Sequence, residues 1–238
     1  MEKVIWDIYG KVYDSTMLQI IPYRRMMKRV YEALGPVGGG RYLDAGCGTG
    51  NFLKLLADSN GKAEAVGVDF SRAMLRRAEK KNAGNGRQVE LLALDLNQGL
   101  PFADGTFDGI VCLNVLYILK DPDFMIRELN RVLAHNGRLV LSTPISKPRI
   151  LPILKEHVAV LKDMYQGYWA FYFLGFIIKF FFSSLVVLMI NLFITRSKHY
   201  FFFNRSELEP LFEKNRFKII NTDIVYGEQV WLVVAVKI

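Results

Sequence analysis

The sequence predicts a doubly wound α/β fold built on a mostly parallel sheet. From residue 41 to 143, short apolar segments alternate with segments of helical periodicity, the pattern of a parallel sheet covered on both faces. The first apolar segment runs into a loop with glycines at positions 46, 48 and 50. Glycine permits the tight turn through which such a fold brings backbone N–H groups close to a ligand. The 238 residues suffice for one substantial domain with an insertion.

The expected elements follow in order along the chain. An amphipathic helix covers 16–34 and ends at the glycines and proline of 35–40. We then expect strands at 41–45, 64–68, 88–93, 107–113 and 138–143, and helices at 50–58, 71–82 and 122–134. Asn136-Gly137 supplies the turn before the fifth strand. A capped helix over 205–214 and a hairpin of strands at 217–226 and 229–238 complete a Rossmann-like, seven-stranded sheet whose last two strands are antiparallel.

The segment after the fifth strand is both the most basic and the most apolar part of the chain. Residues 144–205 hold eight Lys/Arg and two Asp/Glu, whereas residues 43–143 hold twelve of each. Lys179 is the only charge within 164–195. A single membrane crossing would separate the two halves of the sheet, so we expect a helical pair lying in one leaflet with basic flanks toward the headgroups. A cap packed on the core or in a homo-oligomer is the alternative.

Cysteine usage and the N-terminus indicate a cytoplasmic setting. Two cysteines, Cys47 and Cys112, are too few for a disulfide framework and are expected to be buried small residues. The first residues include acidic side chains and no long apolar run, so we expect no secretory signal. The sequence has no cluster with metal-ligand spacing. These features predict a peripheral or monotopic protein on the cytoplasmic face of a membrane, with no metal.

Several ordered blocks identify a family. Asp69 follows Gly50 by 19 residues, at the end of the second apolar segment, which is the spacing at which a strand-end carboxylate reaches the hydroxyls of a nucleotide ribose. Together the blocks resemble the class I S-adenosylmethionine-dependent methyltransferases, and within them the quinone-biosynthesis and phospholipid N-methyltransferases. The blocks are Leu43–Gly50, Val66–Ser71, Leu94–Leu96, Leu100–Asp108 and Leu129–Leu139.

This resemblance implies the cofactor S-adenosylmethionine and a role for each matching position. Asp69 is expected to accept both ribose hydroxyls, and Asp95 the adenine amino group. The residues expected to hold the methionine part are Asp44 and the loop residues Gly46, Cys47, Gly48 and Gly50. The residues expected around the adenine and the methyl group are Leu96 through its backbone N–H, Phe70 or Met74 at the ring faces, and Asn114 at the end of the fourth strand.

Two tyrosines are candidate catalytic residues. Tyr13 lies in a tyrosine-aspartate segment that resembles the N-terminal part of this subgroup that closes over the cofactor. Tyr117 stands where the subgroup often has an acidic residue or a histidine. The residues after the fourth strand lack the Asn/Asp-Pro-Pro-aromatic motif of nucleic-acid amino methylation. Because the predicted core is also neutral, we expect no nucleic-acid partner.

The sequence therefore predicts a methyltransferase acting on a lipid or lipid-tailed acceptor, either a phospholipid amine or a polyprenyl quinol, at the membrane surface. Three alternatives stay open: a soluble small-molecule methyltransferase with a dimerising cap, a membrane scaffold that binds the cofactor without transfer, and a nucleic-acid-binding protein. The expected parts are an N-terminal segment at 1–40 that closes over the site, a cofactor-binding core at 41–143, the apolar insertion at 144–204 and the C-terminal helix and strand pair at 205–238.

Overall fold

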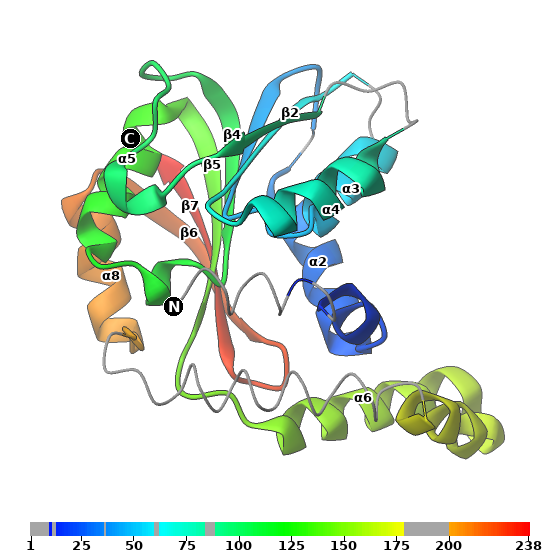
Figure 1. Cartoon of the computed structure of the whole chain (residues 1–238). Helices are drawn as coiled ribbons and strands as arrows, with labels where there is room; N and C mark the ends of the chain where they lie inside the picture. Colours follow the sequence, from blue (N-terminus) through cyan, green and yellow to red (C-terminus); the bar gives the residue numbers. More distant parts are fainter. Residues whose placement is uncertain (1–9, 11–12, 36, 60–61, 84–88, 179–199) are drawn as a thin grey trace.

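A single mixed sheet organises the protein. The computed structural model describes residues 10, 13–35, 37–59, 62–83, 89–178 and 200–238. Seven strands lie in the order β3-β2-β1-β4-β5-β7-β6 (Figure 1). They are β1 (Arg41–Ala45), β2 (Glu64–Asp69), β3 (Val89–Ala93), β4 (Phe107–Leu113), β5 (Leu133–Pro144), β6 (Phe217–Val225) and β7 (Val230–Lys237).

The strand directions confirm the predicted fold class. β1 pairs in parallel with both β2 and β4, β3 extends the sheet beyond β2, and β5 extends it beyond β4. β7 then inserts antiparallel between β5 and β6, as the predicted C-terminal hairpin requires. The order of the strands reverses between β1 and β4, and in such sheets ligands bind in the crevice beyond the carboxyl ends of the strands at this point.

Helices cover both faces of the sheet (Figure 1). One core packs the sheet against α5 (Pro122–Val132) and α8 (Arg205–Lys214), with Met125, Leu129 and Phe212 fully buried. The opposite core packs it against α2 (Ile21–Ala33), α3 (Asn51–Ser59) and α4 (Arg72–Asn82). The short helices η1 (Leu96–Gln98) and η2 (Leu116–Ile118) follow β3 and β4. Alternating apolar residues in the strands supply both cores, which explains their nearly continuous apolar sequence.

The helix predicted at 16–34 is not continuous in the structure. Residues 13–17 are helical, residues 18–19 form a turn, and α2 begins only at Ile21, after the extended residue Ile20. Pro22 in the first turn of α2 explains the break. Its ring would clash with the carbonyl of residue 18 in a continuous helix, whereas a proline is tolerated in the first turn. The chain can therefore bend between the N-terminal helical residues and α2.

The fifth strand is longer than predicted. β5 begins at Leu133, directly after α5, and Asn136-Gly137 lies inside it rather than before it. The pairing with β4 passes from Phe107–Leu133 to Gly109–Arg138, so residues 134–137 form an irregularity in the ladder. Asn136 has a φ of 63° there, a left-handed conformation that asparagine tolerates better than most residues. The turn predicted before the fifth strand is therefore an irregularity inside it.

The insertion starts as a long helix at the end of β5. α6 (Ile150–Tyr165) leads through η3 (Gln166–Tyr168) into further helical residues at 169–178. Among the residues that the structure describes, no helix is both long and apolar enough to span a membrane. The remainder of the predicted membrane segment, including Lys179, lies outside the described residues. The capped helix predicted over 205–214 is confirmed as α8, which begins with a capping box formed by Asn204 and Glu207.

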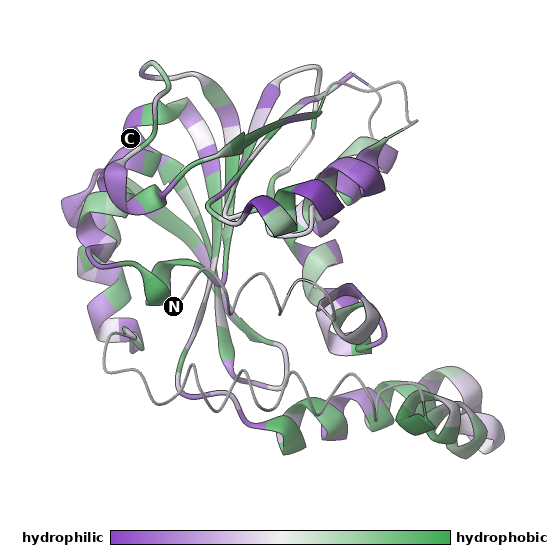
Figure 2. Ribbon diagram, viewed as in Figure 1, coloured by the Kyte–Doolittle hydropathy of each residue, from purple (hydrophilic) through white to green (hydrophobic). Residues whose placement is uncertain are grey.

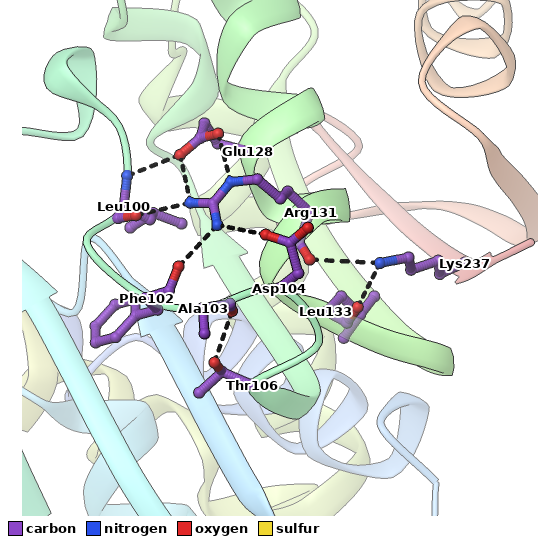
Figure 3. Close-up of polar contacts among 9 residues, drawn as sticks. All are labelled: Leu100, Phe102, Ala103, Asp104, Thr106, Glu128, Arg131, Leu133 and Lys237. Carbon is purple, nitrogen blue, oxygen red and sulfur yellow. Dashed lines mark hydrogen bonds and ion pairs between the residues drawn. The ribbon is translucent and has the colours of Figure 1, made fainter.

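Arg131 fixes the connection between η1 and β4 (Figure 3). Its guanidinium donates from Nε and Nη2 to the two carboxylate oxygens of Glu128, both at 2.9 Å. It also donates to the carbonyl oxygens of Leu100 and Phe102, both at 2.7 Å, and to Asp104 at 2.9 Å. The hydrogen bond from Arg131 lowers the pKa of Glu128. One side chain on α5 thus holds the loop that follows the predicted adenine site.

Replacing Arg131 by methionine is expected to lower the free energy of unfolding by about 2 kcal/mol, because two carbonyls and Glu128 lose a charged donor. Urea denaturation measures the change. Arg127→Met on the same helix is the matched control, since Arg127 is exposed and contacts the Phe124 ring. The control should change stability by less than about 0.5 kcal/mol. Equal losses in the two variants would contradict the role assigned to Arg131.

Candidate active site

The glycine loop between β1 and α3 is bound to the end of β2. The backbone N–H groups of Gly46 and Cys47 both donate to the carbonyl of Val68, at 2.8 and 2.9 Å. Gly46, Gly48 and Gly50 have φ values of 85°, 52° and 74°, which favour glycine. A Cβ on Gly46 would lie 2.2 Å from Cγ2 of Val115. The loop therefore needs glycine both for its backbone conformation and for its contact with the end of β4.

Asp44 is a buried carboxyl at the end of β1. It is 3% exposed, and within the described chain no hydrogen bond or ion pair joins its carboxyl to another group. Burial, with a smaller contribution from the negative charge of Asp69, raises the pKa of Asp44 to about 8. A buried carboxyl without a partner is costly, and a ligand ammonium would supply the missing charge. The residue thus fits the predicted contact with the methionine part of the cofactor.

Asp69 lies at the end of β2 and is held by two backbone N–H groups. Gly48 donates to its Oδ2 at 3.0 Å and Ser71 to its Oδ1 at 2.8 Å. Each carboxylate oxygen can accept more than one hydrogen bond, which is what contact with a diol requires. Ser71 in turn caps α4, because its Oγ accepts the N–H of Met74. This geometry fits the predicted bidentate contact with ribose hydroxyls.

The predicted adenine residues lie next to Asp69. The N–H of Leu94 donates to the Asp69 carbonyl at 3.1 Å, which joins the end of β3 to the end of β2. Asp95 is exposed, and its Oδ1 accepts from the backbone N–H and the side-chain Nδ2 of Asn97, at 3.0 and 2.8 Å. Leu96 is buried. Asn97 was missed from the sequence, although it is an ordinary partner for an aspartate that begins a short helix.

The remaining cofactor candidates lie at the ends of β2 and β4. Phe70 is half-buried, and Met74 is buried on α4. Asn114 has a φ of 54°, and its N–H donates to the carbonyl and the hydroxyl of Ser142, at 2.8 and 3.1 Å. Within the described part of the chain, its side-chain Oδ1 is buried without a hydrogen-bond partner. Such an atom fits a ligand that donates a hydrogen bond.

The two candidate catalytic tyrosines lie in different surroundings. Tyr13 meets Tyr23 of α2 edge to face, with 6.3 Å between ring centroids. Tyr117 on η2 packs against Tyr200 and Phe202, at 5.5 and 6.3 Å, and its carbonyl accepts the N–H of Phe201. The segment that returns from the insertion therefore covers η2 at the end of β4. A catalytic role for either tyrosine stays a prediction.

Both cysteines are buried, as predicted. Burial raises the pKa of the Cys112 thiol to about 12 and also raises the pKa of Cys47. Neither thiol is therefore a nucleophile at neutral pH. No group of three or more His, Cys, Asp or Glu side chains within the described ranges is arranged to hold a metal ion.

A polar cluster beside the glycine loop was not predicted as such. The carboxylate of Asp14 accepts from Thr49 Oγ1 at 2.6 Å and from Asn51 Nδ2 at 3.2 Å, and forms an ion pair with Lys81 at 2.8 Å. Asn51 also donates to the Tyr23 hydroxyl at 3.2 Å. Asp14 belongs to the quoted tyrosine-aspartate segment, but nothing in its sequence neighbourhood indicates Lys81, which is 67 residues away.

Asp44 generates a testable pH dependence. Its folded-state pKa of about 8 lies above the unfolded value of about 3.9, so its contribution to folding is present at low pH and is lost as pH rises toward 8. Asp44→Asn is therefore expected to raise the melting temperature of the unliganded protein at pH 8 more than at pH 5, while it weakens binding of S-adenosylhomocysteine. Differential scanning calorimetry across this range measures the change. A melting-temperature difference independent of pH would contradict the assignment.

Comparison with known proteins agrees with the fold and with the motifs. Residues 43–141 match a family model described as a methyltransferase domain. A ubiquinone/menaquinone biosynthesis C-methyltransferase of Desulfotalea psychrophila is 36% identical over 63% of this chain and 58% of the relative. A phosphatidylethanolamine N-methyltransferase of Cereibacter sphaeroides is 33% identical over 57% of this chain and 63% of the relative. The matches thus span less than two thirds of either relative.

Solved structures show the same fold. The magnesium protoporphyrin IX methyltransferase of Synechocystis PCC 6803, crystallised with bound S-adenosylhomocysteine, has a TM-score of 0.61 and 21% identity. The likeness covers 92% of this chain and 86% of that protein. A geranyl diphosphate methyltransferase has a TM-score of 0.63 and 17% identity over 91% of this chain and 78% of that protein. Residues 43–141 thus resemble a methyltransferase domain, and the fold is one that S-adenosylmethionine-dependent methyltransferases share.

Proposed function

We propose that the chain transfers a methyl group from S-adenosylmethionine to a lipid or lipid-tailed acceptor at a membrane surface. The observation that carries this proposal is an exposed apolar helical segment joined directly to the end of β5. The carboxyl ends of the strands, where Asp44 and Asp69 lie, are the ligand-binding edge of this fold. A membrane contact at this edge would bring lipid headgroups toward the cofactor. The acceptor would be a phospholipid amine or a polyprenyl quinol.

Hydrophobic residues predominate along α6 and the helical residues that follow it (Figure 2), and several of their large apolar side chains are exposed. Leu151 is 72% exposed, Tyr168 78%, Phe171 77% and Ile178 61%. Soluble monomers rarely expose so many neighbouring apolar residues without an interaction to cover them. Tyrosine and phenylalanine suit the headgroup region of a bilayer. We assign this surface, residues 150–178, to membrane contact and name it the insertion surface.

Basic residues accompany the insertion surface. Lys147 and Arg149 precede α6 and are exposed, as are Lys155 and Lys162 on the helix. A shallow groove of about 420 Å³ runs along α6 and is lined by Leu151, Leu154, Lys155, Val158, Ala159 and Lys162. An apolar surface with basic side chains matches an anionic bilayer better than a neutral partner. A dimerising cap would bury the same apolar residues without needing the cations.

Hydrogen bonds fix α6 to the sheet, so the insertion surface has a defined orientation. Arg149 donates its N–H to Oε1 of Gln229 at 2.6 Å, and Nε2 of Gln229 donates to the Arg149 carbonyl at 2.8 Å. Glu156 on α6 accepts the N–H of Gly227 at 2.6 Å. The buried His157 accepts the N–H of Ile21, the first residue of α2, at 3.2 Å. The β6–β7 turn and α2 therefore support the helix from two sides.

The proposed reaction depends mainly on how the protein positions the cofactor and the acceptor. When bound, S-adenosylmethionine supplies a sulfonium methyl that is already activated for in-line displacement. Asp44 and the glycine loop would orient its methionine part, Asp69 its ribose and Asp95 with Leu96 its adenine. Asn114 would accept a hydrogen bond beside the acceptor. Exclusion of water and alignment of the nucleophile would then govern the rate.

The function is tested with purified protein, methyl-labelled S-adenosylmethionine and vesicles of phosphatidylethanolamine with or without phosphatidylglycerol. A second set of vesicles contains a reduced polyprenyl quinone. We expect label in the lipid extract of one set, and about 10²-fold less with Asp69→Asn, which loses charged hydrogen bonds to the ribose. The set that takes the label identifies the acceptor. Label that never enters lipid, with cofactor binding intact, would overturn the lipid acceptor and favour a soluble one.

The insertion surface is tested by flotation on anionic vesicles. Tyr168→Ser combined with Phe171→Ser is expected to lower the vesicle-bound fraction at least 10-fold, because two exposed aromatic side chains no longer enter the bilayer. Ile220→Ser is the matched control, since Ile220 is exposed on the edge strand β6, and it should float like the wild type. Unchanged flotation of the double variant, or a stable dimer that stays unbound, would contradict membrane contact.

A further inference from the structure

The polar cluster around Asp14 joins three parts of the chain at the glycine loop. Asp14 lies in the helical residues 13–17, Thr49 and Asn51 flank the last glycine of the loop, and Lys81 lies at the end of α4. Besides its ion pair with Asp14, the Lys81 ammonium donates to Thr49 Oγ1 at 3.2 Å and to Asn51 Oδ1. Asp14 and Lys81 thus contact each other, and each also contacts both Thr49 and Asn51.

The cluster is largely withdrawn from solvent. The side chains of Lys81 and Asp14 are 19% and 26% exposed, and Thr49 is buried. Burial lowers the pKa of Lys81, whereas its hydrogen bond to Asp14 opposes that shift. A partly buried ion pair contributes little net stability, because desolvation offsets the attraction between the charges. Such a pair does fix relative position, since either charge alone would be left uncompensated.

The cluster controls where the N-terminal residues lie relative to the proposed cofactor site. Asp14 directly follows Tyr13, and Thr49 and Asn51 bracket Gly50 in the loop. The same N-terminal segment reaches the adenine side of the site, since a Cβ on Gly10 would lie 2.9 Å from Sδ of Met74. Asp14 therefore contacts the glycine loop at one end of the proposed cofactor site, and Gly10 lies against α4 at the other.

We propose that Lys81 is a positioning residue for cofactor binding. Through Asp14 it fixes the N-terminal helical residues across the glycine loop and so slows escape of the bound cofactor. Lys81 acts only through Asp14, Thr49 and Asn51 and is not a catalytic residue. The inference rests on the proposed placement of the cofactor but is independent of the acceptor. Loss of the Lys81 charge should therefore weaken cofactor binding without affecting vesicle binding.

The test compares Lys81→Met, Asp14→Asn and the double variant by isothermal titration with S-adenosylhomocysteine. Each single variant is expected to weaken binding about 10-fold, mainly through faster dissociation, and the double variant no more than the worse single one, since both act through one contact. Lys81→Arg should restore most of the affinity, because it retains a charged donor. Lys80→Met is the matched control, since Lys80 is the exposed neighbour on α4.

Thermal unfolding and vesicle flotation of the same variants separate positioning from folding. We expect the double variant, which leaves no unpaired charge, to melt close to the wild type, and we expect unchanged flotation in every variant. Wild-type affinity in Lys81→Met, or losses that add in the double variant, would overturn the proposal. A loss of affinity that Lys81→Arg does not restore would also overturn it. Because the titration needs no acceptor, a failure here is distinguishable from a failure to methylate lipid.

Discussion

The proposed cofactor site depends on two carboxyl groups brought to one edge of a sheet. Asp44 and Asp69 lie near the carboxyl ends of neighbouring parallel strands, where Asp44 pairs with Gly67, two residues before Asp69. Asp69 is satisfied by backbone N–H groups of the glycine loop and of α4, whereas Asp44 is buried and lacks such donors in the described chain. Their repulsion and the burial of Asp44 disfavour the unliganded state. A cationic ligand beside Asp44 would remove that cost, and we propose that this contributes to cofactor binding.

The rest of the fold supports this edge from three directions. The carbonyl of Val68 accepts two hydrogen bonds from the start of the glycine loop. The Asp14–Lys81 pair joins the helical residues 13–17 to the end of that loop. Arg131 holds the loop beyond η1, on the adenine side. On the acceptor side, Gln229 and Glu156 hold α6 against the β6–β7 turn. In the proposed function, this rigid attachment lets one surface meet the membrane while the neighbouring edge performs the transfer.

The sequence predicted the sheet and the positions of the acidic residues because these depend on local patterns. Apolar runs, glycine breaks and the 19-residue spacing between Gly50 and Asp69 are all visible along the chain. Contacts between distant residues were not predictable: the Lys81 partner of Asp14, the β4–β5 irregularity and the support of α2 by His157 all require the tertiary fold. Pro22 indicates a break before Ile21, but the amphipathic pattern across 16–34 favoured one continuous helix.

The central claim is that the two carboxyl groups bind the cofactor, and a crystal structure with S-adenosylhomocysteine tests it most directly. The account predicts the ligand ammonium within about 3.2 Å of an Asp44 oxygen and both ribose hydroxyls at similar distances from Asp69. It also predicts that Gly48 and Ser71 still donate to Asp69 in that complex. A ligand bound away from the strand ends, or a ribose held by other side chains while Asp69 contacts only the loop, would contradict the account.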